Sequence, residues 1–333
     1  MRLLLSLALV SMILGSNGET ALLVVDVQDC FLDTNTNSGD PGSLSVTKAS
    51  DIIPLINQIR TEKSCLFDTV VRSQDFHTEH HISFGPTHGL DPFAHLFGKG
   101  ELPLTCVLPQ SGMTSDGSCC PGYYITPNNY DCDKQLCPSV TFSESVISDS
   151  PACSICKNTP EECFETTQAM WTNHCLQTGD SMFPPSLYIE KSDLVVQKGT
   201  NKYVDAYSAF MDNTKKLKTE LDDTLKDQGV TTIFVVGIAT DYCVYYSTMD
   251  ALDLGYEVIV VLDATKGIAD ETTNAAVEDM KAKGATIVMT SDVLAMECSM
   301  TEEETISDGF LISPTTNAIA SFVILTFVTM IVL

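Results

Sequence analysis

The chain has 333 residues and a mass of 36.2 kDa, with 44 acidic against 18 basic side chains and a formal net charge of -26. A chain this acidic repels phosphate backbones and anionic lipid surfaces, and the sequence contains no local basic cluster, so nucleic-acid binding and a polybasic membrane patch are excluded. The 13 cysteines exceed what an ordinary cytosolic enzyme carries, and because the number is odd, full pairing leaves at least one thiol over.

The first 18 residues are typical of a secretory signal peptide. Arg2 supplies a positive start, residues 3–14 form an apolar run of signal length, and residues 15–18 are small and polar. The apolar run is shorter than the roughly 20 residues that a membrane-spanning helix needs, which disfavours an N-terminal membrane anchor. We therefore expect cleavage near Gly18 and a mature chain outside the cell.

The middle of the chain alternates short β-branched runs with segments of helix length. Strands are expected at 22–27, 66–71, 194–197, 233–238, 258–262 and 286–289, and helices at 45–60, 204–228, 244–254 and 272–283. This alternation predicts an α/β fold with a doubly wound, mainly parallel six-stranded sheet and helices on both faces. In such sheets the functional side chains collect just beyond the carboxyl ends of the strands.

Carboxylates and histidines follow the first two predicted strands. Asp26 ends the first apolar run, and alone it would be interpreted as a turn or capping residue. The second strand leads into Asp75 and His77, with His81 four residues further on. An Asp-x-His spacing suits a borderline divalent metal, because alternate residues of an extended segment point the same way and combine oxygen and nitrogen ligands. His174 is a candidate to complete this set.

Residues 99–170 interrupt the pattern, and Pro, Gly, Ser and Cys become frequent there. A loop of this length is unusual in a compact domain, but disulfide bonds in an oxidising compartment can hold it together. Cys153 and Cys156 also have zinc-ligand spacing, yet secretion and the lack of any His in the segment favour a disulfide-rich insertion of undetermined connectivity. The segment contains eight cysteines: Cys106, Cys119, Cys120, Cys132, Cys137, Cys153, Cys156 and Cys163.

A lysine and a cysteine follow the third and fourth predicted strands. Lys198 comes directly after the third strand, and Cys243 stands at the start of the helix after the fourth. At a helix start the dipole and a nearby cation favour the thiolate, and backbone N–H groups are available to hold an oxyanion. The alternative is a buried cysteine with a structural role only.

The C-terminal residues resemble the attachment signal of a glycosylphosphatidylinositol anchor. The small residues 307–309 precede a polar spacer at 310–317 and an uncharged apolar run at 318–333. A single spanning helix is less consistent with 16 apolar residues that no Lys or Arg follows. We expect 301–317 to be a linker with attachment near Ser307, and the protein to lie on the extracellular face of the plasma membrane, bound to the membrane only through this lipid.

Taken together, the motifs resemble the nicotinamidase branch of the isochorismatase-like hydrolases. The resemblance covers roughly residues 21–290 apart from the insertion, and rests on a Val-Asp-Val-Gln sequence at the first strand, Asp-x-His at the second, Trp-Thr-Asn-His, Ala-Tyr-Ser-Ala-Phe and Asp-Tyr-Cys-Val. It implies a hydrolase domain at 19–300, interrupted by the insertion at 99–170. Two departures from the family pattern are this insertion and Cys30, which replaces an acidic residue.

The resemblance also implies roles for particular residues. They are a catalytic triad of Asp26, Lys198 and Cys243; metal ligands Asp75, His77 and His174, with His81 at a position that ligates metal in some members only; aromatic pocket walls Phe31, Trp171 and Tyr207; an oxyanion hole of the Ala239 and Cys243 N–H groups; and a cis peptide between Ile238 and Ala239.

The implied activity is hydrolysis of nicotinamide to nicotinate and ammonia. Cys243 would attack to form a thioester, Asp26 would move the proton, and Lys198 would favour the ionised forms of both. A divalent ion, zinc by ligand type with iron or manganese as alternatives, would bind the pyridine nitrogen and water. Other hypotheses are a related amidase or N-carbamoyl hydrolase, or an inactive surface-anchored binding protein. The sequence leaves the oligomeric state open.

The cysteines outside the insertion divide into two groups. Cys30, Cys65, Cys175 and Cys298 either form two bridges or stay buried and reduced, and Cys243 is expected to be the free thiol. The other three histidines, His80, His88 and His95, are interpreted as surface or loop residues.

Overall fold

The structure, a computed structural model, describes residues 18–34, 39–81, 83–88, 101–105, 124–125, 165–201, 204–213, 215 and 217–298. These residues all lie within one compact unit, Met1–Cys298. The predicted signal peptide, the eight cysteines of the insertion, His95 and the predicted anchor signal lie outside the described residues.

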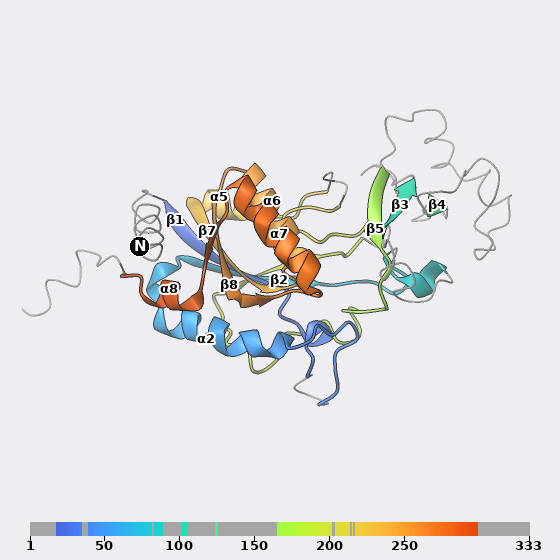
Figure 1. Ribbon diagram of the computed structural model, residues 1–333, viewed down its shortest axis with the longest axis horizontal. Coiled ribbons are helices and arrows are strands. Elements are labelled where there is room, and N and C mark those ends of the chain that lie inside the picture. Colours follow the sequence, from blue (N-terminus) through green and yellow to red (C-terminus); the bar gives the residue numbers. More distant parts are fainter. Residues whose placement is uncertain are drawn as a thin grey trace, which may run out of the picture. The chain divides into compact units, whose positions relative to one another are not determined.

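Six parallel strands form the central sheet in the order β6-β2-β1-β7-β8-β9 (Figure 1). Their bounds are β1 Glu19–Val25, β2 Thr69–Asp75, β6 Leu194–Lys198, β7 Val230–Ile238, β8 Glu257–Lys266 and β9 Thr286–Val288. The chain builds outward from β1 through β2 to β6, and then outward in the other direction from β7 through β8 to β9. The doubly wound sheet is confirmed, and its switch point lies between β1 and β7, where ligands bind in folds of this kind.

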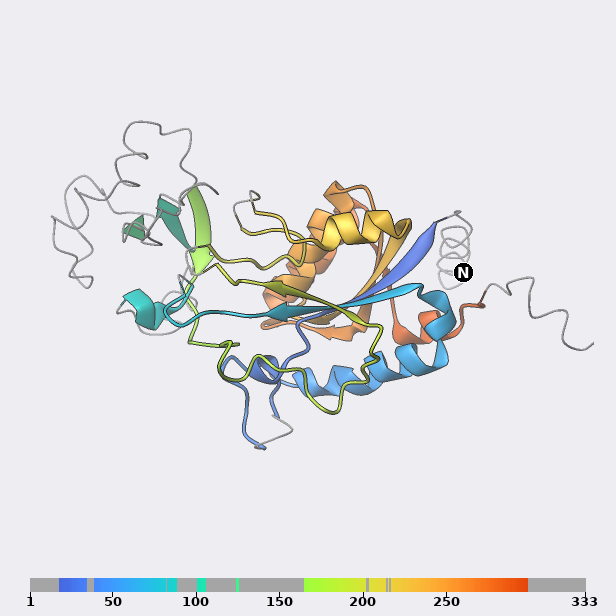
Figure 2. The same cartoon turned by 180° about the vertical axis from the view of Figure 1, so that it is seen from behind.

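Helices cover both faces of this sheet, as Figures 1 and 2 show. One face carries α5 (Leu221–Asp227), α6 (Cys243–Asp253) and α7 (Asp270–Lys283), and the other carries α2 (Ile53–Glu62) and α8 (Thr290–Leu294). Alternate residues of β1 enter the two cores, with Leu22 and Val24 on the α2 side and Leu23 on the α6 side. Every side chain of β1 from Thr20 onward is buried. A strand that is buried on both faces needs apolar residues at successive positions, and residues 21–25 provide them. Short 3₁₀ helices at Asp29–Phe31, Ala49–Ile52, Ser64–Leu66 and Gly85–His88 connect the elements.

The predicted helix at 204–228 is wrong over most of its length. Among the described residues of this range, only Leu221–Asp227 is helical, and residues 204–210 form a buried loop. Side chains satisfy the backbone of this loop: the Tyr207 N–H donates to Asn213 Oδ1 at 3.0 Å, and the Ala209 N–H donates to Ser247 Oγ at 2.9 Å. Ser and Asn side chains compete in this way with helical hydrogen bonds.

A second sheet occupies part of the predicted insertion. Its antiparallel strands, in the order β4-β3-β5, are β3 Glu101–Thr105, β4 Tyr124–Ile125 and β5 Glu165–Ala169. The sequence predicted no strong secondary structure here because these strands are short and their hydrophobic patterns are weak. The last strand, β5, leads directly into Trp171.

Two disulfide bonds resolve the alternatives left open for four cysteines. Cys30 pairs with Cys175 across a Cα–Cα distance of 5.2 Å, and Cys65 pairs with Cys298 across 5.7 Å. Among the described cysteines only Cys243 is a free thiol, as expected.

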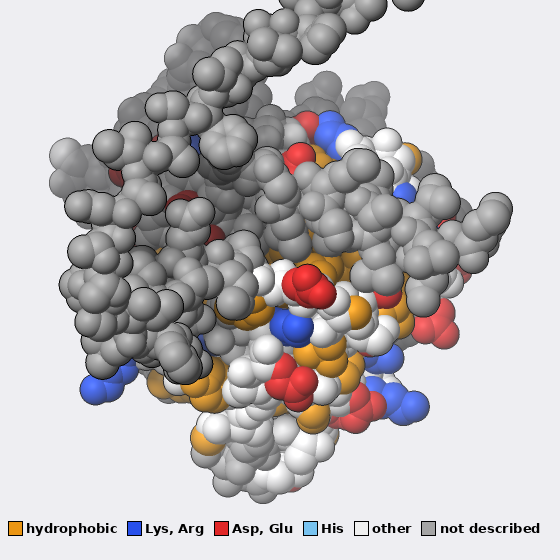
Figure 3. Space-filling view, turned by 90° about the vertical axis from the view of Figure 1, so that its left-hand side faces the viewer, with side chains coloured by type: hydrophobic (Ala, Val, Ile, Leu, Met, Phe, Trp, Pro, Cys, Tyr) orange, Lys and Arg blue, Asp and Glu red, His pale blue; other side chains and the backbone are white. Residues whose placement is uncertain are grey.

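On the face drawn in Figure 3, the acidic side chains of the described residues do not gather into one negatively charged patch. Acidic, basic and hydrophobic side chains alternate over short distances there. None of the helices formed by the described residues is long and apolar enough to cross a membrane.

Candidate active site

Three chain segments bring the predicted catalytic triad together at the carboxyl edge of the sheet. Asp26 follows β1, Lys198 ends β6, and Cys243 begins α6, the helix after β7. The Lys198 Nζ lies 2.9 Å from Asp26 Oδ2 and 3.4 Å from Cys243 Sγ. Asp26 and Lys198 are almost wholly buried, at 0% and 2% exposure. The lysine ammonium therefore bridges a carboxylate and a thiol away from bulk water.

The electrostatics of this group follow from burial and from the proximity of opposite charges. Burial raises the pKa of the Cys243 thiol well above its usual value, although the positive charge of Lys198 opposes this. Burial alone would lower the pKa of Lys198, but Asp26 and Asp75 raise it well above the ordinary lysine value, so Lys198 stays charged. The thiol thus rests mainly as S–H, beside a cation that stabilises the thiolate once a base removes the proton.

Asp26 is held in place by its own backbone and by β2. Its φ of 47° lies in the left-handed region, which an Asp adopts more readily than most residues. Ser73 Oγ donates to Asp26 Oδ1 at 2.6 Å and accepts from the Asp26 N–H at 3.1 Å. Burial raises the pKa of Asp26, against the lowering effect of Lys198. A buried carboxylate with a raised pKa is suited to accept and return a proton.

The backbone before Cys243 combines a cis peptide with a tight turn into α6. The Ile238–Ala239 peptide is cis, which confirms the expectation from the family resemblance. The Ala239 carbonyl accepts from the Tyr242 and Val244 N–H groups, both at 3.0 Å. Among the described residues, neither the Ala239 nor the Cys243 N–H donates a backbone hydrogen bond to another element. These are the two N–H groups that the family resemblance assigns to the oxyanion hole.

A carboxylate and two imidazoles meet next to the triad. His77 Nε2 lies 2.9 Å and His174 Nε2 3.4 Å from Asp75 Oδ2, while Asp75 Oδ1 contacts Lys198 Nζ at 3.1 Å. Burial raises the pKa of Asp75, but His77 and Lys198 outweigh burial and hold it well below the ordinary range. The carboxylate is therefore ionised.

The hydrogen bonds of the two imidazole rings show whether a metal fits here, because the Nδ1 atom of each ring is bound to a backbone carbonyl. His77 Nδ1 donates to Gly199 O at 2.9 Å, and His174 Nδ1 donates to Thr172 O at 2.8 Å. These bonds place a proton on each Nδ1 and turn each Nε2 toward Asp75. Nε2 can then bind a divalent metal once it gives up its own proton, as imidazole ligands of metals do. The donor set of two imidazoles and one carboxylate fits such an ion. Cys175 also lies close, but its disulfide bond removes it as a thiolate ligand.

His81 differs from the other two histidines. It is fully buried, and its Nδ1 lies 2.8 Å from Ser83 Oγ and its Nε2 3.1 Å from the Asn201 carbonyl. Because a carbonyl only accepts, Nε2 carries the proton, and neither ring nitrogen of His81 offers a lone pair toward Asp75. His80 is exposed, as predicted.

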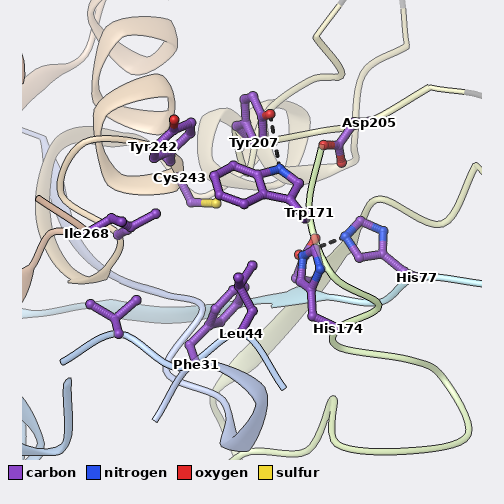
Figure 4. Close-up of a pocket in the computed structure, with 13 residues that line it drawn as sticks. Phe31, Leu44, His77, Trp171, His174, Asp205, Tyr207, Tyr242, Cys243 and Ile268 are labelled. Atoms are coloured by element: carbon purple, nitrogen blue, oxygen red, sulfur yellow. Dashed lines mark hydrogen bonds and ion pairs between the residues drawn. The ribbon is translucent and has the colours of Figure 1, made fainter. Parts of the chain in front are cut away.

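An aromatic pocket adjoins these groups (Figure 4). The predicted walls Phe31, Trp171 and Tyr207 all line it, and Trp171 Nε1 donates to the Tyr207 hydroxyl at 3.3 Å. In the view of Figure 4, Cys243 lies on one side of Trp171 and the two histidines on the other. A flat aromatic ligand in this pocket would reach both the thiol and the imidazoles.

Several lining residues were not predicted from the sequence. The Tyr242 ring centroid lies 5.0 Å from that of Trp171 and 5.4 Å from that of Tyr207. A carboxylate oxygen of the buried Asp205 lies within 4.8 Å of a ring nitrogen of His77 and of His81. Tyr242 lies within the Asp-Tyr-Cys-Val motif, and Asp205 directly precedes Ala-Tyr-Ser-Ala-Phe. Position beside a motif residue was the only signal, because their partners come from loops far away in sequence. The remaining additions are the apolar Leu44, Val46 and Ile268.

Gln28 is a further residue without a predicted role, although it lies in the Val-Asp-Val-Gln sequence. Its buried side-chain amide donates to the carbonyls of Asp75 at 2.8 Å and Ser181 at 2.7 Å, and it accepts from the Asp75 N–H at 2.8 Å. These bonds fix the end of β2, where the carboxylate leaves the strand.

Comparisons with known proteins agree with this geometry. The sequence model of the isochorismatase domain matches residues 166–292. A nicotinamidase of Acinetobacter baylyi is 30% identical over 277 residues, covering 82% of this chain and 94% of the relative. Among solved structures, a nicotinamidase and pyrazinamidase of Acinetobacter baumanii superposes with a TM-score of 0.56 at 29% identity, covering 84% of this chain and 99% of that one.

A pyrazinamidase of Pyrococcus horikoshii, solved in complex with zinc, superposes with a TM-score of 0.50 at 25% identity, covering 81% of this chain and 99% of that one. The similarity extends over nearly the whole length of each relative. From the fold, the site and this similarity together, the chain belongs to the nicotinamidase branch of the isochorismatase-like family of amide hydrolases.

Proposed function

We propose that this protein hydrolyses nicotinamide to nicotinate and ammonia. The observation that carries the proposal is the buried Lys198 ammonium, which contacts both the Asp26 carboxylate and the Cys243 thiol beside an aromatic pocket. The relative that is 30% identical over most of its length is a nicotinamidase, which supports the same substrate here.

The chemistry is acyl transfer through a thioester. Asp26 takes the thiol proton as the Cys243 sulfur attacks the carboxamide carbon, and the Ala239 and Cys243 N–H groups hold the resulting oxyanion. The C–N bond then breaks as Asp26 returns the proton to the leaving nitrogen, which departs as ammonia. In the second half, Asp26 accepts a proton from water, whose oxygen attacks the thioester carbon. Collapse releases nicotinate and restores the thiol.

The pocket walls orient the substrate. Phe31, Trp171 and Tyr207 offer flat apolar surfaces that suit a pyridine ring and exclude water from the oxyanion. Lys198 keeps its charge throughout, and so stabilises whichever of Asp26 and Cys243 is ionised.

We infer that Asp75, His77 and His174 hold one divalent ion, zinc by ligand type, with iron and manganese as alternatives. When bound, the ion would supply a Lewis acid for the pyridine nitrogen and for water. The related pyrazinamidase solved with zinc supports this inference. His81 would serve as a neighbour of the site rather than as a ligand, because its Nε2 donates to Asn201.

The test is the release of ammonia and nicotinate from nicotinamide by the purified protein and by its Cys243→Ala variant. The variant should lose turnover while its unfolding temperature stays close to that of the parent protein. Turnover by a folded Cys243→Ala variant would overturn the nucleophile assignment. Parallel assays with pyrazinamide and with N-carbamoyl compounds separate nicotinamidase activity from that of a related amidase, and lack of turnover on every amide would favour a binding protein.

We also propose the organisation expected from the sequence. A signal peptide at 1–18 precedes the hydrolase domain at 19–300, which carries the cysteine-rich insertion at 99–170. The linker 301–317 and the apolar tail 318–333 provide a lipid-anchor signal, so the enzyme acts at the outer face of the plasma membrane. Disulfide bonds at Cys30–Cys175 and Cys65–Cys298 support an oxidising compartment.

A further inference from the structure

The Cys30–Cys175 disulfide joins two residues that each directly adjoin a lining residue of the pocket. Cys30 precedes Phe31, Cys175 follows His174, and both cysteines are fully buried. The Phe31 and His174 rings contact each other with centroids 5.7 Å apart, and Figure 4 shows both rings facing the pocket. A covalent bond thus links the backbone segments that carry an aromatic wall and an imidazole.

The backbone at Cys175 has a conformation that cysteine rarely adopts. Its φ of 46° lies in the left-handed region, which is unfavourable for a residue with a Cβ. The Cys175 carbonyl accepts from the His77 N–H at 3.0 Å, and the Gln177 N–H donates to the His77 carbonyl at 2.9 Å. The turn at Cys175 therefore sets the direction of His174 and the path of the chain past His77.

Hydrogen bonds further along the chain also tie the Phe31 segment to the segment after His174, one of them from Gln28 Nε2 to the Ser181 carbonyl at 2.7 Å. The Cys30 N–H donates to the Asp180 carbonyl at 3.0 Å, and the Asp29 N–H donates to the Met182 carbonyl at 2.9 Å. These hydrogen bonds lie five or more residues beyond Cys175. The sulfur bridge is the connection that acts at the strained turn itself, and it joins positions 145 residues apart in sequence.

We propose that Cys30 and Cys175 are positioning residues of the active site, whose disulfide holds the Phe31 wall and the His174 imidazole in register. The inference rests on the proposed function for its substrate readout. Without the bridge, the turn at position 175 relaxes from its left-handed conformation, so His174 moves away from Asp75 and Phe31 moves away from the ring that it packs against.

The second disulfide of the chain provides a matched control. Cys65 precedes the amino end of β2, at the edge of the sheet opposite the site, and it pairs with Cys298. Cys30→Ala/Cys175→Ala and Cys65→Ala/Cys298→Ala each remove one bridge. Both variants are expected to lose stability, but only one of them alters the pocket.

The experiment measures KM for nicotinamide and, independently, zinc affinity by competition with a chromogenic chelator. The Cys30/Cys175 variant should show about 10-fold higher KM and about 10-fold weaker zinc binding, as is typical when the support of a metal ligand is lost, whereas the Cys65/Cys298 variant should match the parent protein in both. Equal values for the two variants would overturn the proposal and leave the bridge as a general stabiliser.

Two further arms keep the outcome decisive. If the alanine pair does not fold, Cys30→Ser/Cys175→Ser replaces it with the same expectation, because serine is close to cysteine in size, forms no bridge and keeps the Cβ that disfavours a positive φ at position 175. If the parent protein does not hydrolyse nicotinamide, the proposed function fails, yet the difference in zinc affinity still decides the role of the bridge.

Discussion

At the scale of single residues, the site places one cation among two carboxylates and a thiol. Lys198 contacts Asp26, Asp75 and Cys243 within 3.4 Å, and its own carbonyl accepts from the Phe76 N–H at 2.9 Å. Buried charges are costly unless they are paired, so removing the lysine would strand two carboxylates in the interior. The same residue therefore contributes to folding and to the chemistry.

The pH dependence of the reaction should report the environment of Asp26. Burial raises its pKa, and the proposed mechanism needs its ionised form to accept the thiol proton. As pH falls through this raised pKa, Asp26 becomes protonated and kcat/KM declines, at a higher pH than an ordinary aspartate would produce. The measurement is kcat/KM from about pH 4 to pH 8 under zinc saturation.

Two controls accompany this profile. Zinc retention across the same range separates protonation of the histidine ligands from that of Asp26, and Asp26→Asn should be inactive at every pH. Activity that stays constant down to the usual range of aspartate pKa values would contradict the assignment of Asp26 as the base.

At the scale of elements, a buried ion-pair cluster fixes strand β6 to the rest of the fold. Asp193, immediately before β6, accepts from Arg60 of α2 through both guanidinium nitrogens, at 2.9 and 2.8 Å. Arg72 of β2 lies 3.3 Å from the same carboxylate. The three side chains are at most 8% exposed. This cluster lies at the amino end of β6, and Lys198 lies at its carboxyl end.

Asp193→Ala should therefore destabilise the protein without altering its chemistry. The substitution leaves two buried guanidinium groups without their carboxylate, which costs about 3–5 kcal/mol. Chemical denaturation measures this loss, and KM for nicotinamide at a temperature where the variant is folded should stay unchanged. Lys281→Ala, which removes an exposed pair with Glu278, is the control and should cost under about 1 kcal/mol. A similar loss in both variants would show that the cluster does not hold β6.

The elements also show how far sequence reasoning reaches. The β-branched runs located all six strands because parallel strands are buried on both faces, but β2 extends four residues past the predicted end at 71. These residues are polar but buried, because side chains of other elements pair with them. Arg72 pairs with Asp193, and Ser73 donates a hydrogen bond to Asp26. The same limitation explains the wrong helix at 204–228, whose backbone is satisfied by distant side chains.

Within the site, the strand-end rule and the family motifs located the three groups of the triad and the cluster around Asp75. They did not identify Tyr242 or Asp205, which enter the pocket only through folding of the loops. Disulfide connectivity was equally inaccessible, because four cysteines permit three pairings and the choice depends on which segments meet in space.

At the scale of the whole molecule, one of the two disulfide bonds lies away from the site. The site lies at the carboxyl edge of the sheet, at the switch point between β1 and β7. The Cys65–Cys298 bridge joins positions 233 residues apart near the opposite edge of the sheet. A link of that span restricts the unfolded chain strongly, by about 5 kcal/mol in the chain-entropy account. Such reinforcement is consistent with the proposed location outside the cell, where thiols oxidise readily.

The proposed location is tested on the full chain expressed in animal cells. If residues 308–333 are removed and a lipid is attached at Ser307, nicotinamidase activity should appear on intact cells, and phosphatidylinositol-specific phospholipase C should release it, because that enzyme cuts the lipid from its headgroup. A chain that ends at Ser307 should enter the medium without treatment. Activity that reaches the surface but resists the phospholipase would instead identify the apolar tail as a spanning helix, and activity confined to the cell interior would contradict the secretory assignment.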